Sequence, residues 1–260
     1  MVYAQESLDE INGKYHELIL LHRRLLLNLG TFQQKLNNEK AREYLMHGIA
    51  RRLDILFQCI ENIFTIFTPN RTEHLSKEEL SNLGINLHAF FINIAGILDN
   101  LGWVFVYENN LFGRRQDGKI DRNGVGLFND ITQQHLNPKL REYLQSELMS
   151  TWYDDYTKKY RDSLAHRIPL YVPPSILNNE QSKEFSDIEA EIQGLDLSHE
   201  EDINKWGALL DKQRSLGVAS HFFAHSMDEG CRPVYFHAQI IADYLTIDEV
   251  INIFCDDFYQ

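Results

Sequence analysis

Two residues that can act on a phosphate, Arg161 and His166, lie five positions apart in the stretch RDSLAH. A guanidinium neutralises an anion, and an imidazole exchanges a proton near neutral pH. Pro169 disfavours helical geometry at Ile168, so a helix through this stretch is expected to end close to His166. The negative end of that helix favours the imidazolium form, which makes His166 a candidate proton donor and acceptor.

Helical geometry limits what one copy of this stretch can do. At about 100° per residue, Arg161 and His166 lie roughly 140° apart around the helix axis. Asp162 shares a face with His166 and can orient its ring. Arg161 can equally pair with Asp162 or with a carboxylate such as Asp99, and His166 can simply bind helix carbonyls. The pattern alone therefore leaves a reaction centre and an ordinary helix end both open.

The stretch RDSLAH resembles the signature of the HEPN superfamily. In that signature an arginine, a polar residue and, after a short spacer, a histidine occur near the end of the last long helix of an all-α bundle. The resemblance covers roughly residues 1–170 by architecture and depends on these six residues for chemistry. It implies a metal-independent endoribonuclease that needs no cofactor and works as a homodimer on RNA. It also implies a toxin or phage-defence role, with an antitoxin or another protein as a further partner.

The resemblance implies a role for each residue of the motif. Arg161 would bind and neutralise the scissile phosphate, and His166 would move a proton during attack by the 2′-hydroxyl. Asp162 occupies the polar position, which is often asparagine in the family, and an aspartate adds negative charge beside the phosphate. Three flanking residues are expected to form a basic rim that binds the substrate: Lys158, Lys159 and Arg167.

A dimer also follows from the chemistry of RNA cleavage. Intramolecular attack requires a base for the 2′-hydroxyl, an acid for the leaving oxygen and a cation for the developing charge. One motif supplies a single histidine. A two-fold contact would bring two copies of His166 and two of Arg161 into one cleft, which completes the set.

Long amphipathic helices are the elements that must position the motif. Apolar residues recur every three or four positions over 8–36, 45–67 and 80–101, as in helices that face a core. A fourth stripe begins after Asn137-Pro138, an N-cap followed by a first-turn proline. Its inner face is expected to comprise Leu140, Leu144, Leu148, Trp152, Tyr156, Tyr160 and Leu164. The prediction is an all-α antiparallel bundle of long helices.

Prolines in the stretch IPLYVPP mark the predicted domain boundary, because each disfavours helix at the residue before it. We therefore expect a helical bundle over 1–168 and an extended connector over 169–179. The acidic C-terminal segment, 180–260, is expected to be mostly helical and either to pack on the bundle or to bind a partner. Capping boxes at Ser198/Glu201 and Thr246/Glu249 are expected to begin two of its helices.

The negative charge is concentrated in this C-terminal segment. The whole chain has a net charge of −13. Residues 1–179 carry 20 Lys and Arg against 21 Asp and Glu, whereas residues 180–260 carry 5 against 17. Only the first region can therefore approach an anionic ligand without general repulsion.

The remaining composition indicates a cytoplasmic protein without a resident metal. The three cysteines lie far apart, as expected in a reducing compartment. The most apolar stretch, 90–106, contains Asn93, Asp99 and Asn100, which favours a core helix over a membrane span. His221 and His225 could bind zinc on a helix together with neighbouring ligand types, namely Asp228, Cys231 and His237. Aromatic packing around Phe222, Phe223 and Phe236 is the favoured interpretation of that segment.

Two other classes of function remain open. The bundle could be a non-catalytic module that binds nucleotides, nucleic acid or protein in the same cleft. Alternatively, the chain could be an interaction protein whose acidic C-terminal segment binds a basic partner.

Overall fold

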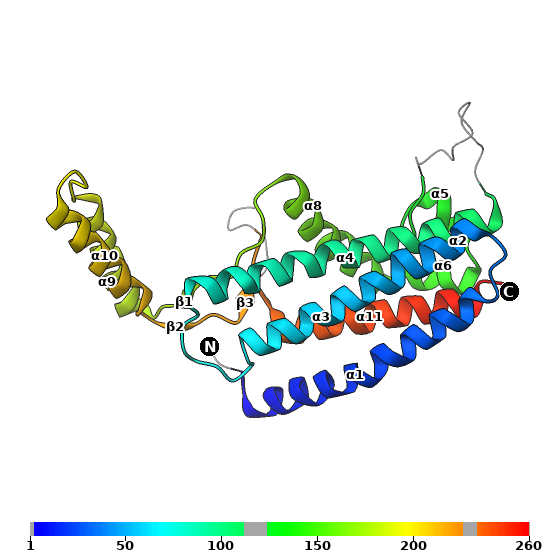
Figure 1. Cartoon of the computed structure of the whole chain (residues 1–260), viewed down its shortest axis with the longest axis horizontal. Helices are drawn as coiled ribbons and strands as arrows, with labels where there is room; N and C mark the ends of the chain where they lie inside the picture. Colours follow the sequence, from blue (N-terminus) through cyan, green and yellow to red (C-terminus); the bar gives the residue numbers. More distant parts are fainter. Residues whose placement is uncertain (1–2, 112–123, 226–232, 260) are drawn as a thin grey trace.

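The computed structural model describes residues 3–111, 124–225 and 233–259. It is mostly helical, which confirms the all-α prediction (Figure 1). The first part of the chain forms α1 (Gln5–Gln33), α2 (Glu39–Glu43), the π-helical η1 (Tyr44–Ala50), α3 (Arg51–Ile66) and α4 (Lys77–Asn109). The middle forms α5 (Asp130–Gln133), α6 (Pro138–Leu144), α7 (Glu147–Ser150), the π-helical η2 (Thr151–Thr157) and α8 (Lys158–His166). The last part forms α9 (Asn179–Gln193), α10 (Glu200–Arg214), α11 (Phe236–Asp257) and the short strands β1 (Ser175–Ile176), β2 (Val218–Ala219), β3 (Phe222–Phe223) and β4 (Val234–Tyr235).

The bundle is built on two long pairings, α3 with α4 and α1 with α11. The predicted apolar stripes supply its core, since Leu18, Leu53 and Ile94 have no exposed surface. Ser76 and Glu79 form the expected capping box at the start of α4. The first three helical stripes are therefore confirmed.

The segment 180–260 consists of two different parts. Its last helix, α11, packs against α1, α3 and α6, and Phe254 near its C-terminal end is fully buried. Thr246 does not begin a helix, because it lies inside α11 and its hydroxyl donates to the Ala242 carbonyl at 3.0 Å. This helix is an integral member of the bundle, and apolar contacts rather than a local cap decide where it begins.

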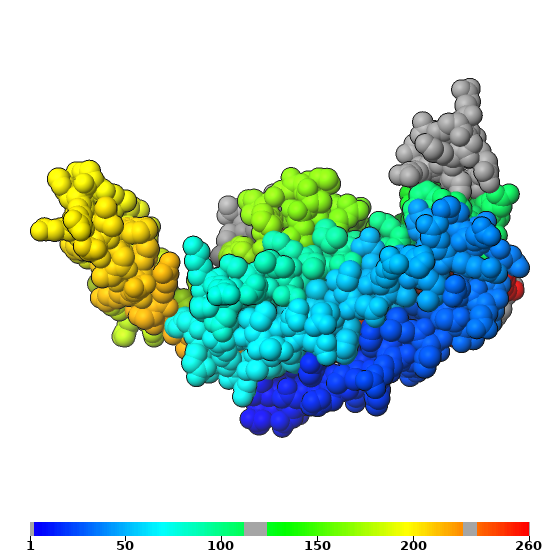
Figure 2. All heavy atoms as spheres, viewed as in Figure 1, coloured from blue at the N-terminus to red at the C-terminus, as the bar shows by residue number. Residues whose placement is uncertain are grey.

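The other part is a helical hairpin, α9–α10, that projects from one end of the bundle (Figure 1). We refer to residues 179–214 as the arm. The antiparallel pair β1–β2 connects the arm to the body, and the space-filling view shows the arm standing clear of it (Figure 2). The predicted cap Ser198 is wrong by one residue: His199 is the N-cap of α10, and its side chain makes no capping bond.

The fourth predicted helix is interrupted. Asn137 caps α6 as expected, accepting from the Lys139 backbone amide at 3.1 Å. However, α6 ends at Leu144, and a new cap at Ser146 begins α7. The interruption changes which side chains face the core, so Leu148 is 76% exposed, whereas Met149 is 1% exposed.

Two π-helical segments, η1 and η2, contact the same helix, α4. The extra residue per turn in a π-helix changes the direction of the following side chains, and such segments recur at functional sites. Here η1 leads directly into α3, and η2 leads directly into α8. The two π-helices therefore set the rotation of the helices that carry Arg52 and Arg161.

Among the described residues, α4 is the one helix long and apolar enough to cross a membrane. In its most apolar window, 61% of the residues are buried inside the protein. This is the behaviour of a core helix and is compatible with a soluble protein.

Two glycines of α4 provide a test of this packing. A β-carbon at Gly102 would lie 2.8 Å from the Cα and 2.9 Å from the carbonyl carbon of Gly126, so Gly102→Ala forces two backbones apart. We expect it to lower the free energy of unfolding by about 1–3 kcal/mol in urea titrations. Gly84→Ala is the matched control, because nothing lies within 4 Å of the added carbon. It should leave stability unchanged or raise it by up to about 1 kcal/mol. Equal stability of both variants would contradict the close approach at Gly102.

Candidate functional site

α8 carries the predicted motif on the surface of the bundle, where it forms a ridge (Figure 2). The helix ends at His166, and Arg167 is no longer helical, as Pro169 predicts. His166 is exposed, and no hydrogen bond or ion pair joins its ring to another described residue. The side chains of Arg161 and Asp162 are 36% and 41% exposed. All three predicted catalytic residues are thus accessible from solvent.

Arg161 is held by carboxylates. Its Nη1 lies 2.8 Å from Oδ1 of Asp162. Desolvation raises the pKa of Asp99 on α4, whereas the charges of Arg161 and Arg52 lower it, so Arg161 lies within the electrostatic reach of a second carboxylate. Asp99 keeps an exposed edge in spite of this desolvation. Asp162 therefore pairs with the guanidinium rather than with the ring of His166, and the charge of Arg161 also acts on Asp99.

Next to Asp99, α4 contacts an arginine of α3, Arg52. Arg52 donates from Nη1 to Oδ1 of Asn93 at 2.8 Å. A β-carbon at Gly96 would lie 2.6 Å from Arg52 Nε, so the guanidinium lies directly on the backbone of α4. Asn93, Gly96 and Asp99 recur every three residues, so each lies beside the next along the helix. These contacts hold Arg52 of α3 against α4, where its positive charge, like that of Arg161, lowers the pKa of Asp99.

A pocket of about 390 Å³ adjoins the motif. Its lining comprises Lys159, Asp162, Ser163, Arg167 and His225. At about 100° per residue, the three lining residues on α8 share one side of the helix with His166. Two of the three expected rim residues reach this pocket, and Lys158 is not among its lining.

The lysines of the rim are paired with carboxylates one turn earlier. Lys158 lies 3.8 Å from Asp154, and Lys159 donates to Asp155 at 2.8 Å. All four side chains are exposed, and exposed pairs of this spacing contribute little stability. A phosphate can therefore replace the carboxylates at a small cost in free energy.

His225 reaches the pocket from a distant part of the sequence. The bridge between Tyr171 and Ala224 aligns the chain beside α8. Phe223 then packs on Tyr160 with ring centroids 5.1 Å apart, and the His225 ring meets the same tyrosine at 4.9 Å. His225 is 6% exposed. The i, i+4 spacing of the histidines could not reveal this position, because that spacing brings two side chains together only on a helix, whereas the chain here contains strand β3.

The helical arrangement assumed for zinc is wrong. His221 and His225 flank strand β3, and the His221 ring packs on Phe67 at 4.5 Å, away from Tyr160. Within residues 3–111, 124–225 and 233–259, no three ligand-type side chains gather closely enough to hold an ion. Asp228 and Cys231 lie outside the described residues.

A buried carboxylate fixes the segment that leads into α8. Asp243 of α11 accepts from Trp152 Nε1 at 2.9 Å, from Gln239 Nε2 at 2.8 Å and from the Tyr156 hydroxyl at 2.7 Å. Trp152 and Tyr156 both belong to η2. Burial raises the pKa of Asp243 to about 6, although the three hydrogen bonds lower it. Asp243 therefore positions η2, and through it α8, on the bundle.

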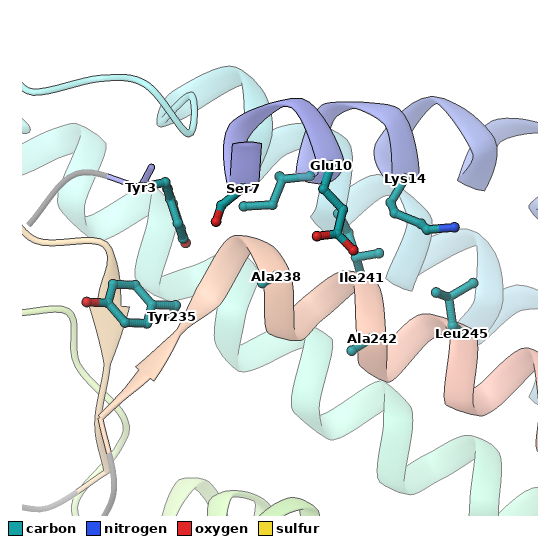
Figure 3. A pocket seen from close by; sticks show the side chains of 10 residues that line it. Tyr3, Ser7, Glu10, Lys14, Tyr235, Ala238, Ile241, Ala242 and Leu245 are labelled. Atoms are coloured by element: carbon teal, nitrogen blue, oxygen red, sulfur yellow. The ribbon is translucent and has the colours of Figure 1, made fainter. Parts of the chain in front are cut away.

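A second pocket, of about 370 Å³, lies between α1 and α11 (Figure 3). Its floor includes Ala238, Ile241 and Ala242, and Glu10 and Lys14 stand at its edge. Because α1 and α8 lie on opposite sides of the bundle in Figure 1, this pocket is separate from the motif. Its floor is apolar, and Lys14 at its edge pairs with Glu17 at 2.9 Å.

Comparisons with known proteins give no relative: no family model matches the chain, and no match was found among curated proteins or solved structures. Any functional conclusion therefore depends on the contacts of α8. There, one copy of the chain supplies a cation, an exposed proton carrier and a pocket with basic residues.

The buried carboxylate predicts a pH dependence of stability. The folded-state pKa of Asp243, about 6, lies above its ordinary value of 3.8, so folding favours the protonated form. Its contribution is complete below about pH 4 and is lost as the pH rises to about 6. Relative to Asp243→Asn, the wild type should lose about 2 kcal/mol of unfolding free energy between pH 4 and pH 7. Urea titrations of both proteins at several pH values measure this difference.

The asparagine variant is a matched reference. It retains the oxygen that Trp152 and Gln239 bind, and the Tyr156 hydroxyl can accept from its amide. His237, whose pKa burial lowers to about 3, affects both proteins equally and cancels. A constant difference between the two proteins across this pH range would contradict the assignment.

Proposed function

We propose that this protein is a metal-independent endoribonuclease of HEPN type that cleaves RNA at a site shared by two copies. The observation that supports the proposal is the exposure of Arg161 and His166 on one surface helix, beside a pocket with Lys159 and Arg167 in its wall. The pocket volume falls in the range of sites that hold a small ligand, which suits one nucleotide. Single-stranded RNA is the substrate that can place one base there while its backbone follows α8.

The proposed chemistry balances when two motifs cooperate. One His166 takes the proton of the 2′-hydroxyl, the 2′-oxygen forms a bond to phosphorus, and the bond from phosphorus to the 5′-oxygen breaks. His166 of the second copy donates a proton to that leaving oxygen. Arg161 binds the non-bridging oxygens and stabilises their increasing charge. The products are a 2′,3′-cyclic phosphate and a 5′-hydroxyl.

Asp162 competes with the substrate for Arg161 in this proposal. The guanidinium pairs with the Asp162 carboxylate at 2.8 Å, so a phosphate has to displace or share that partner. The carboxylate itself repels the phosphate from the adjoining pocket. Asp162 therefore weakens substrate binding and keeps basal cleavage slow.

The first test is cleavage of single-stranded RNA by the purified protein in EDTA. We expect the wild type to cut and His166→Ala to lose at least about 100-fold in rate, because proton transfer of this kind contributes about 10² or more. Arg161→Ala should lose a comparable amount, since Arg161 carries the charge stabilisation. Denaturing gels and analysis of the cyclic phosphate end give the readout.

His135→Ala is the control, because His135 is exposed and lies at the end of α5 rather than on α8. Cleavage that survives in His166→Ala would contradict the assignment. Binding of RNA without cleavage by the wild type would instead support the non-catalytic module. The rate should also rise more than linearly with protein concentration in the range where dimers form.

The second test removes the charge of Asp162. Asp162→Asn keeps the shape of the side chain, releases Arg161 from an ion pair and removes a repulsive charge. We expect cleavage to increase by about tenfold, mainly through a lower KM, since about 1.4 kcal/mol of interaction corresponds to that factor. Steady-state rates measured against RNA concentration separate KM from kcat. A lower rate in Asp162→Asn would mean that the carboxylate assists catalysis.

A further inference from the structure

The arm buries very little of its own surface. In α9 and α10 together, the only described side chains below a tenth exposed are Ile188 and Gln213, at 4% and 6%. Helices of 15 residues are marginal in water unless tertiary packing stabilises them. A two-helix hairpin with so small a core is therefore stabilised by any third element that covers it.

The two sides of the arm differ. Lys205 pairs with Glu191 at 2.8 Å and Lys212 with Glu184 at 2.9 Å, so ion pairs bridge one side of the hairpin. Ile203 and Leu210 each precede one of these lysines by two positions. Around the axis of α10, each therefore points about 160° away from that lysine. Trp206 lies between them at helical spacing. The side opposite the ion pairs is thus an apolar stripe.

This stripe is exposed and continues onto α9. We define the arm stripe as Phe185, Ile203, Trp206 and Leu210. The exposed fractions are 47% for Ile203, 39% for Trp206 and 36% for Phe185. An aromatic and aliphatic stripe of this kind, on an element that projects into solvent, is the composition of an interaction surface.

The charge around the stripe restricts what can cover it. The arm contains ten Asp and Glu against four Lys and Arg, a net charge of −6, which leaves −7 for the rest of the chain. Nucleic acid and anionic membrane surfaces are repelled by such a surface. A second arm is repelled as well, because it carries the same charge. The complementary occupant is a basic polypeptide.

We propose that the arm stripe binds a basic amphipathic helix of another protein, which completes a three-helix bundle. The apolar face of that helix covers Trp206 and Ile203. Its Lys and Arg side chains pair with Glu200, one turn before Ile203, and with Glu189 on α9, whose carboxylate also accepts from Gln213 Nε2 at 2.9 Å. An arginine placed on the Trp206 ring adds a cation–π contact. This interaction is separate from RNA cleavage and goes beyond the proposed activity.

The attachment of the arm leaves α8 uncovered. Ala219 donates its backbone amide to the Thr72 carbonyl at 3.3 Å, and His74 Nε2 lies 3.1 Å from the Leu216 carbonyl. Gly217 has a φ of +86°, a conformation that favours glycine and turns the chain between α10 and β2. The arm is therefore fixed at the loop before α4. A helix bound to the stripe extends the assembly at this end of the bundle.

The experiment uses the whole 260-residue chain and two labelled synthetic peptides that form amphipathic helices. One carries leucine with lysine and arginine, and the other has glutamate in place of every basic residue. Fluorescence anisotropy at physiological salt should show binding of the basic peptide alone. Trp206→Ala should weaken it by about tenfold, as expected for a central aromatic contact. Ile203→Ser should also weaken it, and it removes a side chain that contributes little to the packing of the hairpin.

Two further variants separate charge from apolar contact. The pair Glu189→Gln with Glu200→Gln should weaken binding several-fold and reduce its dependence on salt. Leu27→Ala is the matched control, because Leu27 is an exposed apolar residue on α1, at 73%. It should leave binding unchanged. Circular dichroism of each variant reports whether the arm remains helical.

Several results would overturn the proposal. These are no binding of the basic peptide, equal binding of the acidic one, or an equal loss in Leu27→Ala. A concentration-dependent dimer of the free protein that Trp206→Ala abolishes would identify a second copy as the occupant instead. RNA cleavage by Trp206→Ala should equal that of the wild type, so this proposal and the proposed activity can fail independently.

Discussion

The position of α8 depends on a carboxylate buried in the centre of the protein. Asp243 receives three donors, and two of them come from η2, the turn that leads directly into α8. Burial holds the pKa of Tyr156 well above its usual value, so its hydroxyl remains a donor. A carboxylate without exposed surface is costly unless every donor is in place, which makes this arrangement a precise constraint. The rotation of η2, and therefore the direction of Arg161, follows from it.

The sequence predicted the parts of the fold that depend on local periodicity. The stripes that end in α3 and α4, with the cap at Ser76, could be read because burial repeats every turn. The prediction that Leu148 faces the core was wrong, because a short turn at Gln145 restarts the helix and shifts the register. The packing of α11 in the bundle could not be decided from the sequence either. Its acidic residues favour a solvent-exposed helix, and only the fold brings to Asp243 the three hydrogen-bond donors that allow its burial. Pairings between distant segments carry no periodic signal.

The same division applies to the candidate site. The end of α8 at His166 followed from Pro169, and the pairing of Arg161 with Asp162 was one of the alternatives that the sequence left open. The pocket was missed because His225 reaches it through β3 from far along the chain. Arg52 was missed for a similar reason, since only the contact of α3 with α4 lays its guanidinium on Gly96 and within electrostatic reach of Asp99. Among the pocket-lining residues that were missed, only Ser163 could have been found from the local sequence, because it directly follows Asp162 near the end of α8.

The distribution of charge reconciles an acidic protein with an anionic substrate. From the start of η2 through Arg167, the residue after the motif, residues 151–167 carry four Lys and Arg against three Asp, so this stretch is slightly positive. The arm, at −6, projects from the end of the bundle (Figure 1). Since the Debye length at physiological salt is about 8 Å, charges on a projecting element are largely screened at a surface more than that distance away. Concentrating part of the acidity on the arm therefore reduces repulsion at α8 while it creates a surface suited to a basic partner.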